Sequence, residues 1–173
     1  MTKQYVLGAD NGKTGCLVFL DTDTGRIEEI QWYPNDSAKR LYELIEKYKP
    51  VYTVLEKPFM GPGFKNVAST NFEILGRYAQ VLDMLDLKYD AIRAVTWRAK
   101  LKIKAKGRQQ QKEASIQTAA QLFSEEDYMK LHSEWKSINK ELHKKEVHCT
   151  PNDNMCESAL IAYYALQIWR EQQ

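Results

Sequence analysis

Short apolar runs separated by turn residues dominate the start of the chain. An apolar run at 5–9 ends at the tight-turn sequence of residues 10–12, and a second apolar run covers 16–20. A further turn at 21–25 leads into residues 26–33, where apolar and polar positions alternate. The pattern predicts three strands joined by short turns, which form an antiparallel meander.

Helix and strand patterns then alternate. Apolar residues recur at intervals of three and four in the predicted helices, and runs of β-branched and aromatic residues mark the predicted strands. The predicted helices cover residues 36–49, 72–85 and 109–123, and the predicted strands cover residues 51–55 and 89–95. Strands connected through helices lie parallel to one another.

A long helix is predicted over residues 125–145. It begins with a sequence, 124–127, that resembles a capping box. Its apolar positions recur at helical spacing: Tyr128, Leu131, Trp135, Ile138 and Leu142. We expect this stripe to pack against the core.

The last helix is expected to begin at Thr150-Pro151, with threonine as the N-cap and proline at the first helical position, and to run to Trp169. Together these elements predict one α/β domain over residues 1–173. Its mixed five-stranded sheet has three antiparallel strands followed by parallel strands, and helices flank it. This order of strands and helices is that of the RNase H-like fold.

The composition is that of an ordinary globular domain. Hydrophobic residues make up 43% of the 173 residues, which is enough for one core. The longest apolar stretch, 159–169, is too short to span a bilayer, and the start of the chain lacks a signal-peptide pattern. The three cysteines suggest no disulfide framework, and the spacing of His148, Cys149 and Cys156 does not favour a zinc site. We therefore expect a cytoplasmic protein with no membrane partner.

Basic residues are concentrated in one segment. Residues 93–112 contain eight Lys and Arg and no acid, which leaves 17 basic against 23 acidic residues elsewhere, a net charge of −6. Such a charge distribution suits a polyanion such as the DNA phosphate backbone, although a solvated lysine-rich loop is the alternative. The residues expected to contact DNA are Lys100, Lys102, Lys104, Lys106 and Arg108.

Four acids occupy positions from which they can converge. Asp10 ends the first strand and Glu56 ends the fourth, and these two strands are neighbours in the predicted topology. Asp153 and Glu157 lie four residues apart near the start of the last helix, so they share a face. Two unit charges ~4 Å apart repel by roughly 4 kcal/mol at an effective dielectric of about 20. Four converging carboxylates therefore predict bound divalent cations.

Three of these acids also have a purely structural interpretation. The alternatives are a hairpin turn for Asp10, an ion pair with Lys57 or Lys65 for Glu56, and a cap begun by Thr150 for Asp153. Glu157 is harder to explain in this way because it precedes a nearly all-apolar helix. The structural interpretation would require four coincidences.

Three segments of the chain resemble the RuvC-like Holliday junction resolvases. They are Gly-Ala-Asp-Asn-Gly at 8–12, Glu-Lys-Pro-Phe-Met at 56–60, and Asp-Asn-Met-Cys-Glu-Ser-Ala-Leu-Ile-Ala at 153–162. Their order and spacing cover nearly the whole chain, and the resemblance is closer to the phage-encoded branch. The first segment alone also resembles actin-like ATPases and sugar kinases, whereas the third is more specific. The helix that contains residues 75–77 resembles the one through which these resolvases dimerise.

The resemblance implies a metal-dependent endonuclease that cuts four-way or other branched DNA as a homodimer. Two Mg²⁺ or Mn²⁺ ions would be held by Asp10, Glu56, Asp153 and Glu157. One ion would activate the attacking water and the other would stabilise the leaving 3′ oxygen.

Two further residues receive roles from the resemblance. Lys112 matches a position where a lysine approaches the scissile phosphate, so we expect it to take part in catalysis. Phe59 matches an aromatic residue that stacks on bases opened at the junction, an interaction of ~1–3 kcal/mol per base. The alternative for Phe59 is packing on the core, and Phe64 is a second candidate for stacking.

The chain also departs from the family pattern. Glu157 stands where many relatives have aspartate. Asn154 stands where one branch of the family carries an acid, and Asp153 lies one residue earlier. Asp153 is therefore assigned as a metal ligand one residue before the family position. The predicted helix over 125–145 is longer than the usual connection.

Two other functions are compatible with parts of the pattern. A DNA-binding module could keep the fold without the chemistry, but the presence of all four acids argues against it. An actin-like or sugar-kinase-like ATP-binding domain could use residues 10–15 as a phosphate loop. That architecture needs two such domains, and 173 residues without a repeat do not supply them.

Overall fold

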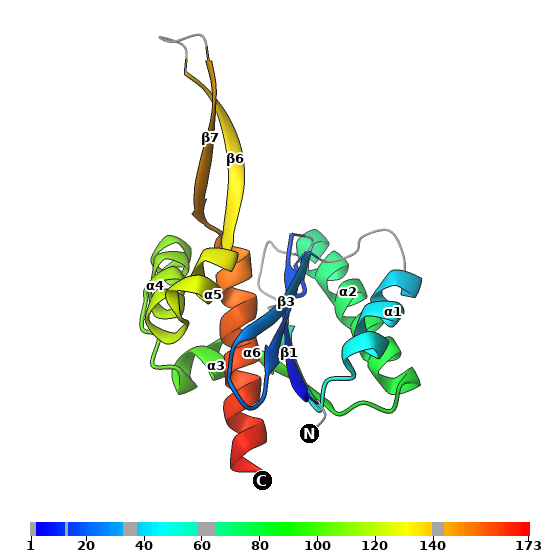
Figure 1. Ribbon diagram of the computed structural model, residues 1–173. Helices are drawn as coiled ribbons and strands as arrows, with labels where there is room; N and C mark the ends of the chain where they lie inside the picture. Colours follow the sequence, from blue (N-terminus) through cyan, green and yellow to red (C-terminus); the bar gives the residue numbers. More distant parts are fainter. Residues whose placement is uncertain (1–2, 13, 33–37, 59–64, 140–143) are drawn as a thin grey trace.

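The structure is a computed structural model that describes residues 3–12, 14–32, 38–58, 65–139 and 144–173, and of residues 65–68, 134–139 and 144–148 it describes the backbone alone. A five-stranded mixed sheet lies at its centre (Figure 1). The strands are β1 (Tyr5–Ala9), β2 (Cys16–Asp21), β3 (Ile27–Trp32), β4 (Tyr52–Lys57) and β5 (Tyr89–Arg93).

The strand order is β3-β2-β1-β4-β5. β2 is antiparallel to both β1 and β3, whereas β4 is parallel to both β1 and β5. The predicted RNase H-like arrangement, with three antiparallel strands followed by parallel ones, is confirmed. The predicted contact between the first and fourth strands is also confirmed.

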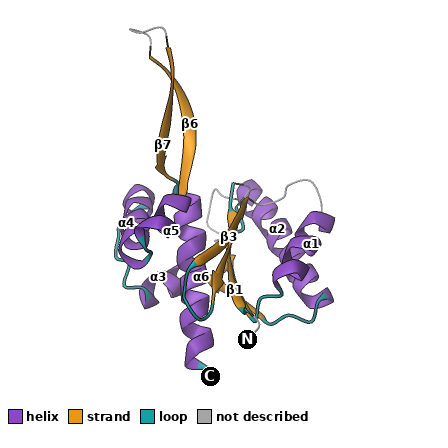
Figure 2. Ribbon diagram, in the orientation of Figure 1, coloured by secondary structure: helices purple, strands orange, loops and turns teal. Residues whose placement is uncertain are grey.

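Helices cover both faces of the sheet (Figures 1 and 2). α1 (Ala38–Tyr48) and α2 (Lys65–Met84) pack on one face. α6 (Asp153–Glu171) packs on the other, where it contacts β1, β2 and β4. The remaining helices lie on the α6 side: α3 (Ala94–Lys100), α4 (Arg108–Leu122) and α5 (Glu125–Lys130).

Alternate residues of the strands build two separate cores, because successive side chains of a strand point to opposite faces. Leu7 and Leu55 belong to the core under α1 and α2, whereas Val6 and Val54 belong to the core under α6. The approach of α6 to β1 is so close that a Cβ on Gly8 would lie 2.1 Å from the backbone nitrogen of Ala162. Glycine at this position therefore sets how near α6 sits to the strand that leads into Asp10.

The predicted helix over 125–145 is wrong. The helix α5 ends at Lys130, and the chain continues as an antiparallel hairpin of β6 (His132–Asn139) and β7 (Lys144–Pro151). The hairpin projects from the body of the molecule (Figure 1). The capping interaction at the start of α5 is confirmed, since the Ser124 hydroxyl accepts a hydrogen bond from the backbone N–H of Asp127 at 3.2 Å.

Two predicted boundaries are also wrong. Thr150 and Pro151 are the last residues of β7, and the N-cap of α6 is Asn152, whose side chain accepts from the N–H of Met155 at 3.1 Å. β5 ends at Arg93 and α3 begins at the next residue, so the basic segment 93–112 is partly helical rather than a loop. Among the described helices, none has the length and hydropathy of a membrane span.

Candidate active site

The ends of β1 and β4 place two acids on the same face of the sheet. Ala9 is paired with Leu55, and both belong to the core under α1 and α2. Because side chains alternate along a strand, the next residues, Asp10 and Glu56, turn toward the α6 face. The parallel register therefore brings these two carboxylates together on the side where the last helix packs.

Asn11 fixes the two strand ends relative to one another beyond the last paired residues. Its side-chain amide donates to the backbone carbonyl of Glu56 at 2.5 Å, and the Asn11 side chain is buried. The turn that follows is tight, since the N–H of Gly12 donates to Oδ1 of Asp10 at 3.1 Å. The alternative role of Asp10 in the turn is thus present, and Asp10 also lines the cleft described below.

The start of α6 supplies the other two acids. Asp153 is the first residue of the helix and Glu157 lies one turn later, so both point toward the ends of β1 and β4. Asn152 anchors this end, since its N–H donates to the carbonyl of Leu131 at 2.9 Å and its side chain donates to Ser133 Oγ at 3.1 Å. The cap that would begin at Thr150 is absent in this described part of the chain, because Thr150 is paired with Ser133 in the hairpin.

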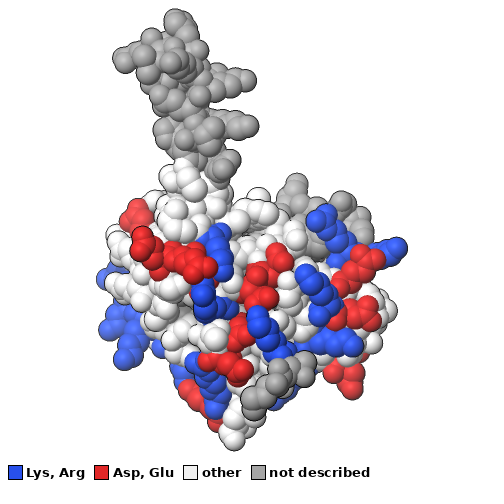
Figure 3. All heavy atoms as spheres, in the orientation of Figure 1, with Lys and Arg blue, Asp and Glu red and all other residues white. Residues whose placement is uncertain are grey.

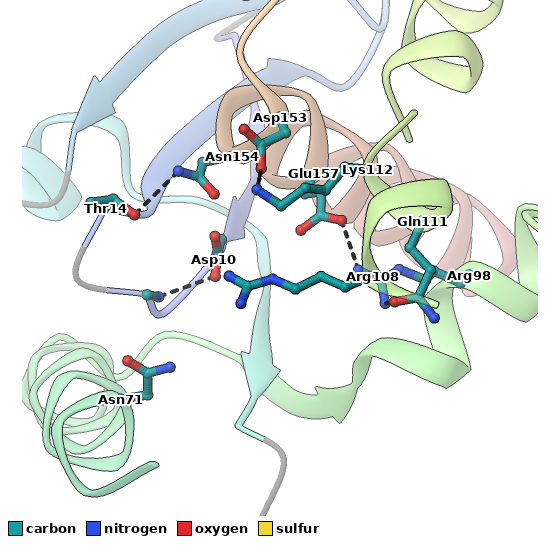
Figure 4. Close-up of a pocket in the computed structure, with 11 residues that line it drawn as sticks. Asp10, Thr14, Asn71, Arg98, Arg108, Gln111, Lys112, Asp153, Asn154 and Glu157 are labelled. Carbon is teal, nitrogen blue, oxygen red and sulfur yellow. Dashed lines mark hydrogen bonds and ion pairs between the residues drawn. The ribbon is translucent and has the colours of Figure 1, made fainter. Parts of the chain in front are cut away.

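A cleft of about 390 Å³ lies between these elements (Figure 4). Residues from the β1–β2 turn, α2, α3, α4 and α6 line it: Asp10, Gly12, Thr14, Asn71, Arg98, Arg108, Gln111, Lys112, Asp153, Asn154 and Glu157. Three of the four predicted acids are in this set. Glu56 lines an adjoining hollow of about 710 Å³, which shares Arg98 and Gln111 with the cleft.

Burial and mutual repulsion disfavour the charged forms of the two strand-end acids. Burial raises the pKa of Asp10 to about 6, and the charge of Glu157 also raises it, while the N–H of Gly12 opposes the shift. Burial likewise raises the pKa of Glu56 to about 7, with a further increase from the charge of Asp10 and an opposing effect of the Trp97 hydrogen bond. A cation between these carboxylates would remove this penalty.

The helix acids already have cationic partners. Lys112 forms an ion pair with Asp153 (Figure 4). Arg98 Nη2 donates to Oε1 of Glu157 at 2.7 Å, and Ser115 Oγ donates to the same oxygen at 3.2 Å. Within the described residues, no ion pair is made by Asp10 or Glu56. The charge imbalance of the cleft is therefore concentrated at the strand ends.

The donor set fits a hard divalent cation, because carboxylate oxygens are the ligands that Mg²⁺ and Mn²⁺ prefer. The unpaired pair Asp10 and Glu56 would form the centre of such a site, and Asp153 and Glu157 would complete it. In the part of the chain that the structure covers, no group of three or more Asp, Glu, His or Cys is gathered closely enough to hold a metal ion as it stands.

The basic residues predicted from the sequence are only partly at the cleft. Arg108 and Lys112 line it, at the start of α4. Lys102, Lys104 and Lys106 are exposed between α3 and α4. Lys100 lies apart from the cleft, where it pairs with Glu171 near the end of α6 at 2.6 Å. On the face drawn in Figure 3, basic and acidic side chains are interspersed.

Phe59 and Phe64 lie outside the described residues, so their expected roles stay predictions. Glu56 does not form an ion pair with Lys57 among the described side chains; its Oε2 accepts from the indole N–H of Trp97 at 2.8 Å.

Reasoning from the sequence missed several residues at the site. Asn11, Trp97 and Arg98 all contact one of the four acids or its backbone. Trp97 and Arg98 stand in a segment whose only prominent sequence feature is its positive charge. The segment Ala94–Lys100 follows a strand and is long enough to have indicated a short helix. No local signal in the sequence, however, identifies which acids the side chains of this helix reach.

No family model matches the sequence, and no curated protein matches it either. Solved structures do match. The chain is similar to Thermus thermophilus RuvC in complex with a Holliday junction substrate, with a TM-score of 0.66 and 14% identity over 97% of this chain and 96% of that chain.

Two further structures agree. A second Thermus thermophilus RuvC structure matches with a TM-score of 0.60 and 14% identity, over 98% of this chain and 97% of that one. The yeast mitochondrial Holliday junction resolvase matches with a TM-score of 0.57 and 15% identity, over 98% of this chain and 80% of that one. At these identities the likeness concerns the fold, and it extends over nearly the full length of the chain. The chain therefore has the fold of the RuvC-type Holliday junction resolvases.

Proposed function

We propose that the chain is a metal-dependent endonuclease that resolves four-way DNA junctions, or other branched DNA. The observation that carries the proposal is the placement of four acids, at the ends of β1 and β4 and on α6, around one cleft and its adjoining hollow, next to Lys112 and Arg108. Likeness to proteins solved as junction resolvases, one of them with a Holliday junction, supports the same reaction.

In this proposal Asp10, Glu56, Asp153 and Glu157 hold two Mg²⁺ or Mn²⁺ ions. When bound, the ions supply the activation of the attacking water and the stabilisation of the leaving 3′ oxygen. Lys112 gives up its contact with Asp153 and turns its ammonium group to the scissile phosphate. Arg108 lines the same cleft and contributes positive charge beside the phosphate backbone.

The proposal includes a homodimer. Two identical sites related by a two-fold axis are suited to paired cuts in a symmetric junction. The helix α2, which contains residues 75–77, is the proposed contact between the two copies.

One gel experiment tests the proposed reaction. A mobile four-way junction, a linear duplex and a flap are each incubated with the chain in Mg²⁺, Mn²⁺ or EDTA. We expect cleavage of the junction with either ion and none in EDTA. Binding of the junction without cleavage under every condition would instead favour a non-catalytic DNA-binding module. The ion pairs Arg98–Glu157 and Lys112–Asp153 are the observation that favours this second candidate, since they already neutralise two of the acids.

The first prediction concerns the strand-end acids. Asp10→Asn and Glu56→Gln keep the shape of each side chain but remove a charged ligand, so junction cleavage should fall by at least about a thousandfold, which corresponds to ~4 kcal/mol in the barrier. The affinity for the junction in EDTA should stay within about twofold of the wild-type value, because lysine and arginine side chains, rather than acids, contact the DNA phosphates. Cleavage time courses and gel-shift titrations measure the two effects.

A matched control is Asp23→Asn, which removes an exposed acid from the β2–β3 turn. It should cleave like the wild-type chain. Junction cleavage at the wild-type rate by either Asp10→Asn or Glu56→Gln would show that the substituted acid is not needed for cleavage, which contradicts the proposed site.

A further inference from the structure

We propose that Trp97 is a positioning residue that orients the Glu56 carboxylate for metal binding. This inference rests on the proposed function, because it concerns the same site. It assigns a role to a side chain that lines neither the cleft nor the hollow and that would otherwise count only as part of the core.

The position of Trp97 follows from the sheet. β5 is the neighbour of β4, and Glu56 is paired with Ile92 in the parallel register. The chain turns into α3 two residues after Ile92, and the first turn of this helix points Trp97 back toward β4. The indole is fully buried, and its Nε1 donates to Oε2 of Glu56 at 2.8 Å.

The hydrogen bond is held in place from both sides. An indole N–H can only donate, and a buried donor left without a partner is costly, so Trp97 has a strong preference for this contact. Glu56 is held independently through its backbone, since Asn11 donates to its carbonyl oxygen. The backbone and one carboxylate oxygen of Glu56 are therefore both fixed.

Fixing Oε2 leaves the other oxygen for a ligand. Among the side chains that the structure describes, none donates a hydrogen bond to Oε1 of Glu56. A carboxylate held in this way presents one oxygen in a defined direction, so ordering it costs less when the cation binds.

Arg98, the residue after Trp97, donates a similar hydrogen bond to a second acid, Glu157. Arg98 donates to Oε1 of Glu157, and Ser115 donates to the same oxygen, so one oxygen of this carboxylate is also held by the protein. Trp97 and Arg98 thus reach acids from β4 and α6 out of one short helix. This repetition indicates that α3 sets the orientation of both carboxylates, whereas packing alone would require only a large apolar side chain.

The test is Trp97→Phe, which keeps a buried aromatic ring but removes the donor. Mn²⁺ binding is measured by electron paramagnetic resonance on the full chain without DNA. Removal of an outer hydrogen bond to a metal ligand typically weakens metal binding by about 10-fold or more. We expect that decrease in affinity, together with a cleavage rate that falls at low Mn²⁺ and recovers as Mn²⁺ is raised.

Tyr52→Phe is the matched control. Tyr52 is also a buried aromatic residue whose polar group donates to an acid, in this case Asp90, and it lies on β4 at the opposite end from Glu56. This substitution should lower thermal stability without changing Mn²⁺ affinity. If both variants are less stable but neither binds Mn²⁺ more weakly, Trp97 is a core residue and the inference is overturned.

A Trp97→Phe chain that does not fold is replaced by one carrying 3-benzothienylalanine at position 97, which has the shape of tryptophan without its N–H. Weaker Mn²⁺ binding in this folded chain supports the inference, and wild-type affinity overturns it. The experiment distinguishes failure of the proposed function from failure of the role proposed for Trp97. A wild-type chain that takes up no Mn²⁺ would overturn the proposed function as well, whereas wild-type affinity in the variant would overturn only the role of Trp97.

Discussion

Asp127 is buried at the start of α5, yet its carboxylate is surrounded by donors. Lys130 Nζ contacts Oδ1 at 2.7 Å, and Ser124 Oγ and Arg26 Nε contact Oδ2 at 3.2 and 3.4 Å. Burial alone would raise the pKa of this acid, but Lys130, with smaller contributions from the backbone hydrogen bond of Ile27 and from Arg26, outweighs burial and holds the pKa below its ordinary value. The ionised form of Asp127 therefore stabilises the contact between α5 and the start of β3.

Asp127→Asn should lower the free energy of unfolding at neutral pH by about 2 kcal/mol, the usual range for a hydrogen bond to a charged group. Because the folded pKa is lowered, the contribution of Asp127 is fully present above the unfolded pKa of about 4 and is lost as the pH falls through the folded value. The difference between variant and wild type should thus shrink below about pH 4. Urea unfolding at several pH values measures it, and a difference that stays constant down to about pH 2 would contradict the role of the charge.

At the same scale, the sequence identifies some site residues and not others. Asp10 and Glu56 come at the ends of apolar runs. Once the two strands are known to be neighbours, the alternation of side chains along a strand gives the face of the sheet to which both acids point. Asn11, Trp97 and Arg98 act on partners 45, 41 and 59 residues away. No local pattern of polarity records such contacts, so their roles could only come from coordinates.

At the scale of elements, the contact of α6 with β1 depends on Gly8. A Cβ at this position would lie 2.1 Å from the backbone nitrogen of Ala162 and 2.5 Å from its Cα, and backbone atoms in a helix cannot move aside as a flexible side chain can. Gly8→Ala should therefore separate the strand from the helix. We expect a decrease of about 3 kcal/mol or more in the free energy of unfolding.

Gly76→Ala is the control for Gly8→Ala. It lies within α2, and a Cβ there would meet no atom within 4 Å. At concentrations where the chain is monomeric, this change should stabilise it by up to about 1 kcal/mol through helix propensity. Equal stability of the two variants in denaturant unfolding would show that α6 can shift away from β1 without cost.

The hairpin shows why element prediction failed at one place. Residues 128–142 have an apolar spacing that fits a helix, and that spacing is the main local signal. The strand β6 instead pairs with β7. A search for helical periodicity within one short segment does not detect a partner strand that lies after an intervening turn. The separate five-stranded sheet was predictable because each of its strands is bounded by turn residues or by a helix.

At the scale of the whole molecule, the exposed lysines between α3 and α4 are the proposed contacts with DNA away from the cleft. Neutralising Lys102, Lys104 and Lys106 together by glutamine should flatten the dependence of junction affinity on salt, by about 0.9 in logarithmic slope for each phosphate that the chain no longer neutralises. Binding titrations from about 50 to about 200 mM salt measure this slope.

Lys100→Gln provides the control from the same basic segment. This lysine is engaged with Glu171, so its neutralisation should leave the slope nearly unchanged. An unaltered slope in the triple variant would assign those three lysines to a solvated surface, which is the alternative interpretation of the segment.

Asn152 forms hydrogen bonds both to the β6 end of the hairpin and to the first turn of α6, and this affects which changes in chain length the site can tolerate. Asn152 joins the foot of the β6–β7 arm to the first turn of α6, and among the side chains that the structure describes every residue of the two cores lies outside the arm. Residues added to both strands at the tip would extend its reach by ~3.4 Å for each pair while Asp153 stays in place. A single residue inserted at the foot would instead displace the acid itself, so we expect the site to tolerate changes of length at the far end of the arm and not at its foot.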